Sequence, residues 1–117
     1  MKIINAEEVH AALSYPELVD ALEEAFAGSY NQPPRQVFLL DDKPDNLDAF
    51  ALLPAWNDKI IALKAFTYYP SNAEPYSLLY SKIMIFDRAH GEPVALVDGT
   101  TCTFWRTGGI SGLATRL

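Results

Sequence analysis

Five apolar segments with the composition of β-strands follow one another in the middle of this chain, and no helical pattern separates them. Each is rich in β-branched or aromatic residues and is bounded by residues that favour turns. The five segments are Val37–Leu40, Phe50–Leu53, Ile60–Thr67, Leu78–Phe86 and Pro93–Val97. Consecutive strands without crossover helices pair antiparallel, so the pattern predicts a mostly antiparallel sheet. The short, glycine-containing joint at residues 87–92 predicts a hairpin between the last two strands.

Two helices are predicted before the sheet. Asn5 with Glu8, and Ser14 with Glu17, each have the spacing of a capping box, in which two side chains satisfy free amide groups at the start of a helix. The apolar positions of the second helix, at helical spacing, are Val19, Leu22, Ala25 and Phe26. Gly28 is placed to end that helix.

A third helical pattern begins near Thr101. Its apolar stripe consists of Ile110, Leu113, Ala114 and Leu117. Gly108, Gly109 and Gly112 each weaken this helix by roughly 1 kcal/mol relative to alanine, so other contacts must compensate. The stripe reaches the last residue without a cap, which suggests an unfinished protein. The predicted fold class is α+β, with two N-terminal helices packed on a mostly antiparallel sheet that a C-terminal helix closes.

Composition limits the classes of partner. A chain of 117 residues, half of them apolar, predicts one domain over residues 1–117. The net charge of −6 and the scattered positive charges argue against nucleic acid and anionic membranes. The single cysteine, Cys102, excludes an internal disulfide and fits a reducing compartment. No stretch is apolar enough for a signal peptide or a membrane span, so we expect a cytoplasmic protein without a membrane partner.

Lys64 is the most informative single residue. It lies in Ile60–Phe66, where every other residue is apolar. An unpaired buried ammonium group is costly, so such a lysine tends to pair with an anion or to have a lowered pKa. Both outcomes are typical of a substrate site. The alternative is a lysine whose apolar stem covers the sheet while its amine reaches water.

Two arginines are further candidates. Arg35 follows Pro33–Pro34, which hold its backbone stiffly before a strand, and its guanidinium can bind a carboxylate through two parallel hydrogen bonds. Arg106 lies in the first turns of the third helix, where helix amides and a guanidinium together attract an anion. The alternatives are a solvated loop arginine and an ordinary helix arginine whose neighbouring glycines serve close packing.

Other site classes have weaker support, and we predict no metal site. His10 and His90 lack the spaced partners of a metal site or a catalytic triad. The acidic stretch at residues 41–48 reads as a solvated turn and fails the EF-hand spacing. Gly109–Leu113 misses the last glycine of a nucleophile elbow, and the sequence contains no Gly-x-Gly-x-x-Gly motif.

Three segments in order resemble the amino-terminal half of the ornithine cyclodeaminase/mu-crystallin family. They are Pro33–Gln36, then Leu53–Trp56 leading to Ile60–Lys64, then Phe86–Asp87 through Asp98-Gly99-Thr100 to Arg106–Thr107. The resemblance implies a homodimeric enzyme that uses NAD or NADP and moves hydride at the α carbon of a small amino or imino acid. It also implies that the sheet forms the dimer interface and that the third helix leads toward an absent Rossmann domain.

The same resemblance implies residue roles. Arg35 and Lys64 match positions that bind the substrate carboxylate, Lys64 also matches a catalytic position near the reacting centre, and Arg106 matches an arginine shared between substrate and cofactor. The sequence departs from the family at Leu78, where many members carry serine or threonine; Ser77 lies one residue away, and the nicotinamide contact stays unassigned. Lys82 is a second departure.

Because the dinucleotide-binding domain is missing from these residues, the resemblance implies that the chain alone is not catalytically competent. The particular amino or imino acid, and the preference for NAD or NADP, stay open. The alternative is a non-enzymatic ligand-binding or dimerisation module of the mu-crystallin type.

Overall fold

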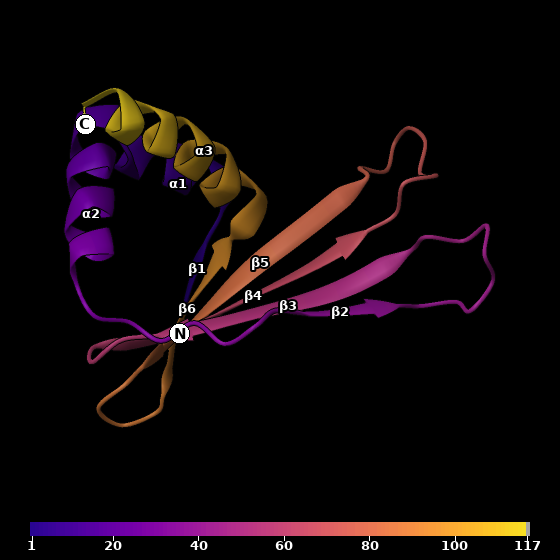
Figure 1. The fold of residues 1–117 in the computed structure, drawn as a ribbon, viewed down its shortest axis with the longest axis horizontal. Coiled ribbons are helices and arrows are strands. Elements are labelled where there is room, and N and C mark those ends of the chain that lie inside the picture. The colour runs from indigo at the N-terminus through magenta and orange to yellow at the C-terminus, as the bar shows by residue number, and fades with distance from the viewer. Residues whose placement is uncertain (117) are drawn as a thin grey trace.

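The computed structural model describes residues 1–116 and has the expected α+β fold, with the helices gathered on one side of a sheet (Figure 1). The strands are β1 (Lys2–Ile4), β2 (Gln36–Leu39), β3 (Ala49–Trp56), β4 (Ile60–Tyr68), β5 (Leu79–Asp87) and β6 (Pro93–Asp98). The helices are α1 (Ala6–Ala12), α2 (Tyr15–Ala27) and α3 (Gly99–Arg116).

The sheet has the strand order β1-β6-β5-β4-β3-β2. Strands β2 to β6 form an antiparallel meander, which confirms the predicted sheet and the predicted hairpin between the last two strands. The sequence reasoning missed β1, which pairs parallel with β6. Three residues are too few to show a strand period, and β1 is defined only by its partner in space.

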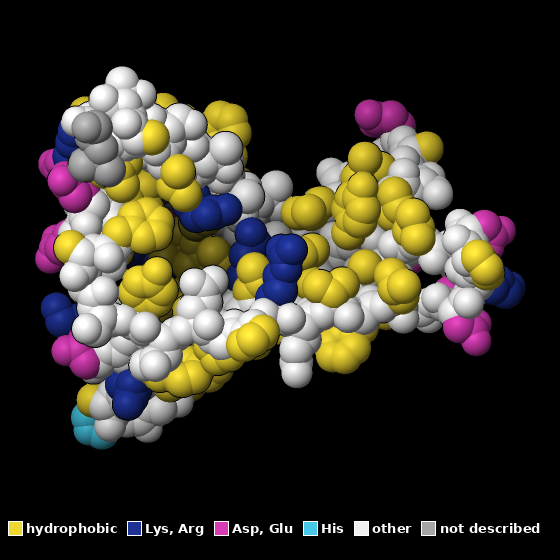
Figure 2. Space-filling view, viewed as in Figure 1, with side chains coloured by type: hydrophobic (Ala, Val, Ile, Leu, Met, Phe, Trp, Pro, Cys, Tyr) yellow, Lys and Arg dark blue, Asp and Glu magenta, His cyan; other side chains and the backbone are white. Residues whose placement is uncertain are grey.

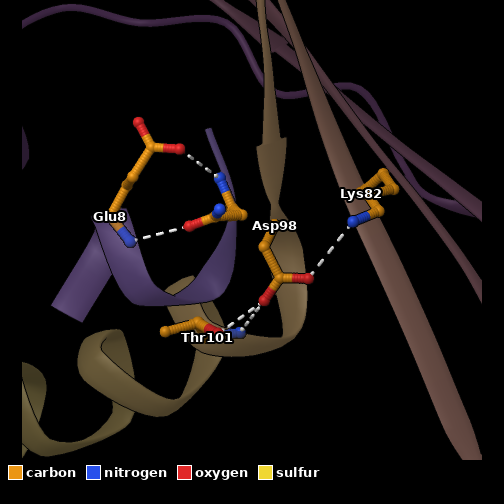
Figure 3. Close-up of polar contacts among 5 residues, drawn as sticks. Glu8, Lys82, Asp98 and Thr101 are labelled. Carbon is orange, nitrogen blue, oxygen red and sulfur yellow. Dashed lines mark hydrogen bonds and ion pairs between the residues drawn. The ribbon is translucent and has the colours of Figure 1, made fainter. Parts of the chain in front are cut away.

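The capping box at Asn5 is confirmed. Oδ1 of Asn5 accepts from the amide of Glu8 at 2.9 Å, and the Glu8 carboxylate accepts from the Asn5 amide at 3.4 Å (Figure 3). The second predicted box is wrong, because the Ser14 side chain makes no cap hydrogen bond. Pro16 stands at the second position of α2 and has no N–H to donate, so one of the two amides that such a hydroxyl caps is absent.

Helix α3 packs closely on α2 because it carries glycines at the contact. A Cβ on Gly109 would lie 2.8 Å from Cδ1 of Leu22 and 2.9 Å from Cδ2 of Leu18, and one on Gly108 would lie 2.6 Å from the hydroxyl of Tyr15. The contacts that compensate for the low helix propensity of these glycines are therefore contacts with α2. Leu113 of the predicted stripe is buried, whereas Leu117 lies outside the described residues.

The core is thin, and much apolar surface is left open. Among residues 1–116, five apolar residues are buried: Val9, Val19, Ala49, Ala51 and Leu113. Strand β2 lies at the edge of the sheet, and Leu39 on it is 64% exposed. In residues 1–116, none of the three helices is long and apolar enough to cross a bilayer.

Candidate functional site

Lys64 lies in the middle of β4, on the side of the sheet that carries the helices. It stands opposite Leu53 on β3 and Ile83 on β5. Its Nζ donates a hydrogen bond to Oγ1 of Thr103 on α3 at 2.5 Å, and it lies 5.9 Å from the centre of the Phe66 ring. The hydrogen-bond partner of this half-buried amine is therefore a hydroxyl of helix α3.

Burial changes how the groups around this amine titrate. The pKa of Lys64 is lowered, first because burial disfavours the ammonium form and second because of the positive charge of Arg106; Cys102 acts in the opposite direction. The pKa of the Cys102 thiol is raised, mainly by burial and then by the Asp98 carboxylate. An anion bound beside Lys64 would favour its charged form, so this position suits a carboxylate.

A cavity of about 310 Å³ opens beside Lys64, between the helices and the sheet. It is lined by Leu13, Leu18, Leu22, Lys64, Ile83, Cys102, Thr103, Trp105 and Arg106. Figure 2 shows Lys and Arg side chains beside a hollow with hydrophobic walls, between the helices on the left and the sheet on the right. Two cations therefore share a small space whose other walls are mostly apolar.

Arg106 lines this cavity and also a second one of about 620 Å³. The second cavity is bounded by the end of α2 and the β3–β4 turn. Its side chain is exposed. Arg88 and Arg116 are hydrogen-bonded, to the Asn57 carbonyl and to two acidic side chains of α2, whereas Arg106 has no such partner within residues 1–116. A guanidinium without a partner is available to an external anion.

Arg35 is exposed and does not line the cavity of Lys64. It directly precedes β2, where Gln36 stands opposite Leu52. Leu53, the next residue of β3, pairs with Lys64 of β4, so two strand positions separate the end of β2 from Lys64. The structure thus brings Lys64 and Arg106 together at one cavity and leaves Arg35 outside it, one residue before β2.

Asp98 fixes the start of α3. Its carboxylate accepts hydrogen bonds from the amide and the hydroxyl of Thr101, at 3.0 and 2.5 Å, and it pairs with Nζ of Lys82 at 3.4 Å (Figure 3). The Thr101 hydrogen bond is the main reason why the pKa of Asp98 is lowered. Lys82, next to Ile83 in β5, is one residue out of phase with Lys64, so it lies on the other side of the sheet.

Sequence reasoning assigned no role to Thr103 and Trp105, which both line the cavity. Thr103 lies three positions before Arg106 on the same helix, and that spacing was the available signal. Trp105 forms a wall that other elements hold: its Nε1 donates to Nδ1 of His10 at 2.9 Å, and its ring centre lies 4.7 Å from that of Tyr15. His10 therefore supports this wall of the cavity from α1.

The β5–β6 hairpin brings Asp87, His90 and Glu92 together, with ligand atoms within 4.8 Å of one another. Nδ1 of His90 lies 3.6 Å from the Asp87 carboxylate. The sequence reasoning overlooked these two carboxylates near His90. The group is largely exposed, and such groups are common on protein surfaces without an ion, so we assign no metal to it.

This chain is similar to known proteins in sequence and in fold. The model of the ornithine cyclodeaminase/mu-crystallin family matches residues 1–117. A Delta(1)-pyrroline-2-carboxylate reductase of Colwellia psychrerythraea is 52% identical over 120 residues, which cover 100% of this chain and 38% of the relative.

Two solved structures have the same fold. An archaeal alanine dehydrogenase dimer with bound NAD has a TM-score of 0.82 and 26% identity over 96% of this chain and 35% of its own. The Thermococcus litoralis Delta(1)-pyrroline-2-carboxylate reductase, in complex with NADH and L-proline, has a TM-score of 0.84 and 24% identity over 98% of this chain and 37% of its own. The chain therefore spans little more than a third of the length of these proteins.

Proposed function

Because the chain belongs to the ornithine cyclodeaminase/mu-crystallin family, we propose that it holds the substrate of a nicotinamide-dependent reductase that acts on a small cyclic imino acid such as Δ1-pyrroline-2-carboxylate. The observation that carries this proposal is the cavity of about 310 Å³ that Lys64 and Arg106 share. A five-membered ring with one carboxylate matches this lining: its apolar ring would contact the apolar walls, and its carboxylate would face Lys64 and Arg106. The 52% identical reductase supports the substrate class.

Each cation has a proposed role. The substrate carboxylate is bound by the Lys64 amine and by the Arg106 guanidinium, which is free within residues 1–116. Arg35, which directly precedes β2, is the third proposed substrate-binding residue. Lys64 is also the proposed catalytic residue. Reduction of a C=N bond requires a proton at nitrogen, and the lowered pKa of Lys64 makes its Nζ a better proton donor than an ordinary lysine.

The proposed cofactor is NAD or NADP. Arg106 suits one end of it, because its exposed guanidinium lines the second, larger cavity as well. The chain has no Gly-x-Gly-x-x-Gly motif to hold a pyrophosphate, so we propose that a Rossmann domain outside these residues binds most of the cofactor. When bound, the reduced nicotinamide supplies the hydride. We expect no turnover by residues 1–117 alone.

Binding of L-proline, the stable reduced ring acid, tests the proposal on this chain. We expect saturable shifts of cavity resonances in NMR titrations, with a Kd on the order of 1 mM, because a ligand of so few atoms contributes roughly 0.5 kcal/mol per atom. L-prolinamide is the matched control, since it lacks the carboxylate. Equal shifts with both compounds, or no shifts at the cavity with L-proline, would exclude a carboxylate site here.

We also propose that two copies of the chain associate through the open face of the sheet. This face is defined by the half-exposed row Pro54, Leu63, Met84 and Leu96, which is one residue out of phase with Lys64. In residues 1–116 no large side chain is fully buried, so the helix side alone gives little core. A second sheet packed on this row would supply the missing burial.

Sedimentation equilibrium measures this association. We expect the wild-type chain to have the mass of a dimer and Met84→Lys to have that of a monomer, because two lysines would face each other in an apolar interface. Phe26→Lys is the matched control, since Phe26 is 56% exposed on α2, away from the open face. A monomeric wild type at high micromolar concentration would rule the proposal out.

We propose a cytoplasmic location, which fits a chain with one cysteine. Cell fractionation tests it, and recovery in an extracellular or periplasmic fraction would contradict it.

A further inference from the structure

Thr103 uses its hydroxyl differently from the later hydroxyl residues of α3. Those of Thr107, Ser111 and Thr115 each donate to the carbonyl oxygen four residues earlier in the helix, at 2.9, 3.2 and 3.0 Å. The Thr103 hydroxyl instead meets Nζ of Lys64 at 2.5 Å, thirty-nine residues away in the sequence. Back-bonding to the helix is the default for such a residue, so the link to Lys64 is a departure that the tertiary structure imposes.

A hydroxyl suits an amine that changes its protonation state. Its oxygen accepts a hydrogen bond from the ammonium form of Lys64, and its O–H can donate to the lone pair of the neutral amine. A carboxylate in this position would favour the ammonium form strongly, because of its negative charge. A carbonyl could accept from either form of the amine but could not donate to the lone pair of the neutral form. Thr103 therefore keeps a partner for Lys64 on both sides of a proton transfer.

The helix fixes this hydroxyl relative to the other cation. Thr103 and Arg106 are three positions apart, so they lie on the same face of α3, and both line the cavity. The start of α3 is in turn fixed by Asp98 through Thr101. A change in the Thr103 rotamer or in the position of α3 would therefore change where Nζ of Lys64 lies in the cavity.

We propose that Thr103 is a positioning residue, which holds the Lys64 amine at the cavity in both protonation states so that it faces the bound acid. The role of the amine toward a bound acid rests on the proposed function, whereas the placement of the amine by Thr103 is independent of any ligand. The charged or titratable groups that act on it are Arg106 and Cys102 on α3, and Asp98, at the start of that helix, acts in turn on Cys102. The sheet and α2 contribute apolar side chains, Ile83, Leu18 and Leu22.

The test compares Thr103→Val, which keeps the shape and removes the hydroxyl, with Thr103→Ser, which keeps the hydroxyl. Lys64 is followed by NMR of its Cε and Nζ in the full chain without ligand, and Lys64→Met identifies its signal. We expect Thr103→Val to lower the pKa of Lys64 further, because the hydrogen bond of the hydroxyl to the ammonium form is stronger than that to the neutral amine, and because the ammonium gains an apolar neighbour. Thr103→Ser should titrate as the wild type does.

L-proline affinity is the second measurement. We expect a loss of about tenfold in Thr103→Val and recovery in Thr103→Ser, whereas the thermal midpoints of all three proteins should be close. An unchanged Lys64 titration in Thr103→Val overturns the inference, whether or not L-proline binds. Absence of L-proline binding to the wild type, together with a shifted titration, would instead contradict the proposed function and leave the placement of the amine standing.

Discussion

Replacing Lys64 with methionine is expected to weaken L-proline binding by about 30-fold to 100-fold, which removes measurable binding at millimolar ligand. The substitution keeps most of the apolar stem and deletes the amine that the cavity presents beside Arg106. One remaining cation cannot replace the pair, because the carboxylate is left with part of its charge unpaired in an apolar space. NMR titration with L-proline measures the loss.

Lys43→Met is the matched control. It removes one positive charge from the loop between β2 and β3, where the Lys43 side chain does not line the cavity of Lys64. We expect it to bind L-proline like the wild type. Equal losses in both variants would mean that net charge, and not the local site, attracts the ligand, and the proposed role of Lys64 would then fail.

The pH dependence should follow the lowered pKa of Lys64. Carboxylate binding needs the ammonium form, so affinity should fall as pH rises through the lowered pKa, before an ordinary lysine would titrate. Folding stability changes in the other direction: between the folded and unfolded pKa values the unfolded chain holds more protons, so the free energy of unfolding rises with pH there. Lys64→Met should therefore be at least as stable as the wild type at neutral pH, while it loses the ligand.

The sheet could be predicted because each strand is recognisable from its own residues and from the turn residues on either side. Lys64 was recognisable as unusual because every other residue of Ile60–Phe66 is apolar, and a lysine on a strand inside the sheet has few ways to reach water. The capping box of Asn5 was also readable, since its two partners are three residues apart and need no tertiary contact.

The parts that could not be predicted depend on contacts between distant segments. Ser14 has the same local spacing as Asn5, yet Pro16 removes one of its possible donors. The roles of Thr103 and His10 arise only when α3 meets β4 and α1. Sequence spacing also does not specify how far Arg35 lies from Lys64, because that distance depends on the register of β2, β3 and β4.

The largest expected effect on stability comes from Gly99, the first residue of α3. A Cβ at this buried position would overlap Oγ of Ser81, and it would lie 3.0 Å from the Ser81 carbonyl carbon and 3.1 Å from the Lys82 amide nitrogen. Two of these atoms belong to the backbone of β5, which β4 and β6 hold on both sides, so they cannot move aside. The clash exists because α3 begins directly against the sheet.

We expect Gly99→Ala to lower the free energy of unfolding by about 2–3 kcal/mol, at the upper end of what overpacking causes. Chemical denaturation measures it. Gly28→Ala is the matched control, because its nearest neighbour would be the Glu24 carbonyl at an ordinary 3.5 Å and its φ of −85° suits alanine; its stability should stay within about 0.5 kcal/mol of the wild type.

The double variant Ser81→Ala, Gly99→Ala separates the side-chain clash from the backbone clash. Ser81 is 4% exposed, and its Oγ has no hydrogen-bond partner within residues 1–116, so removing that atom breaks no hydrogen bond there. We expect partial recovery, since the contacts with the β5 backbone persist. L-proline binding should fall in Gly99→Ala as well, because a displaced α3 carries Thr103 and Arg106 away from Lys64. Stability and binding equal to the wild type in Gly99→Ala would show that the close contact of α3 with β5 does not position the site.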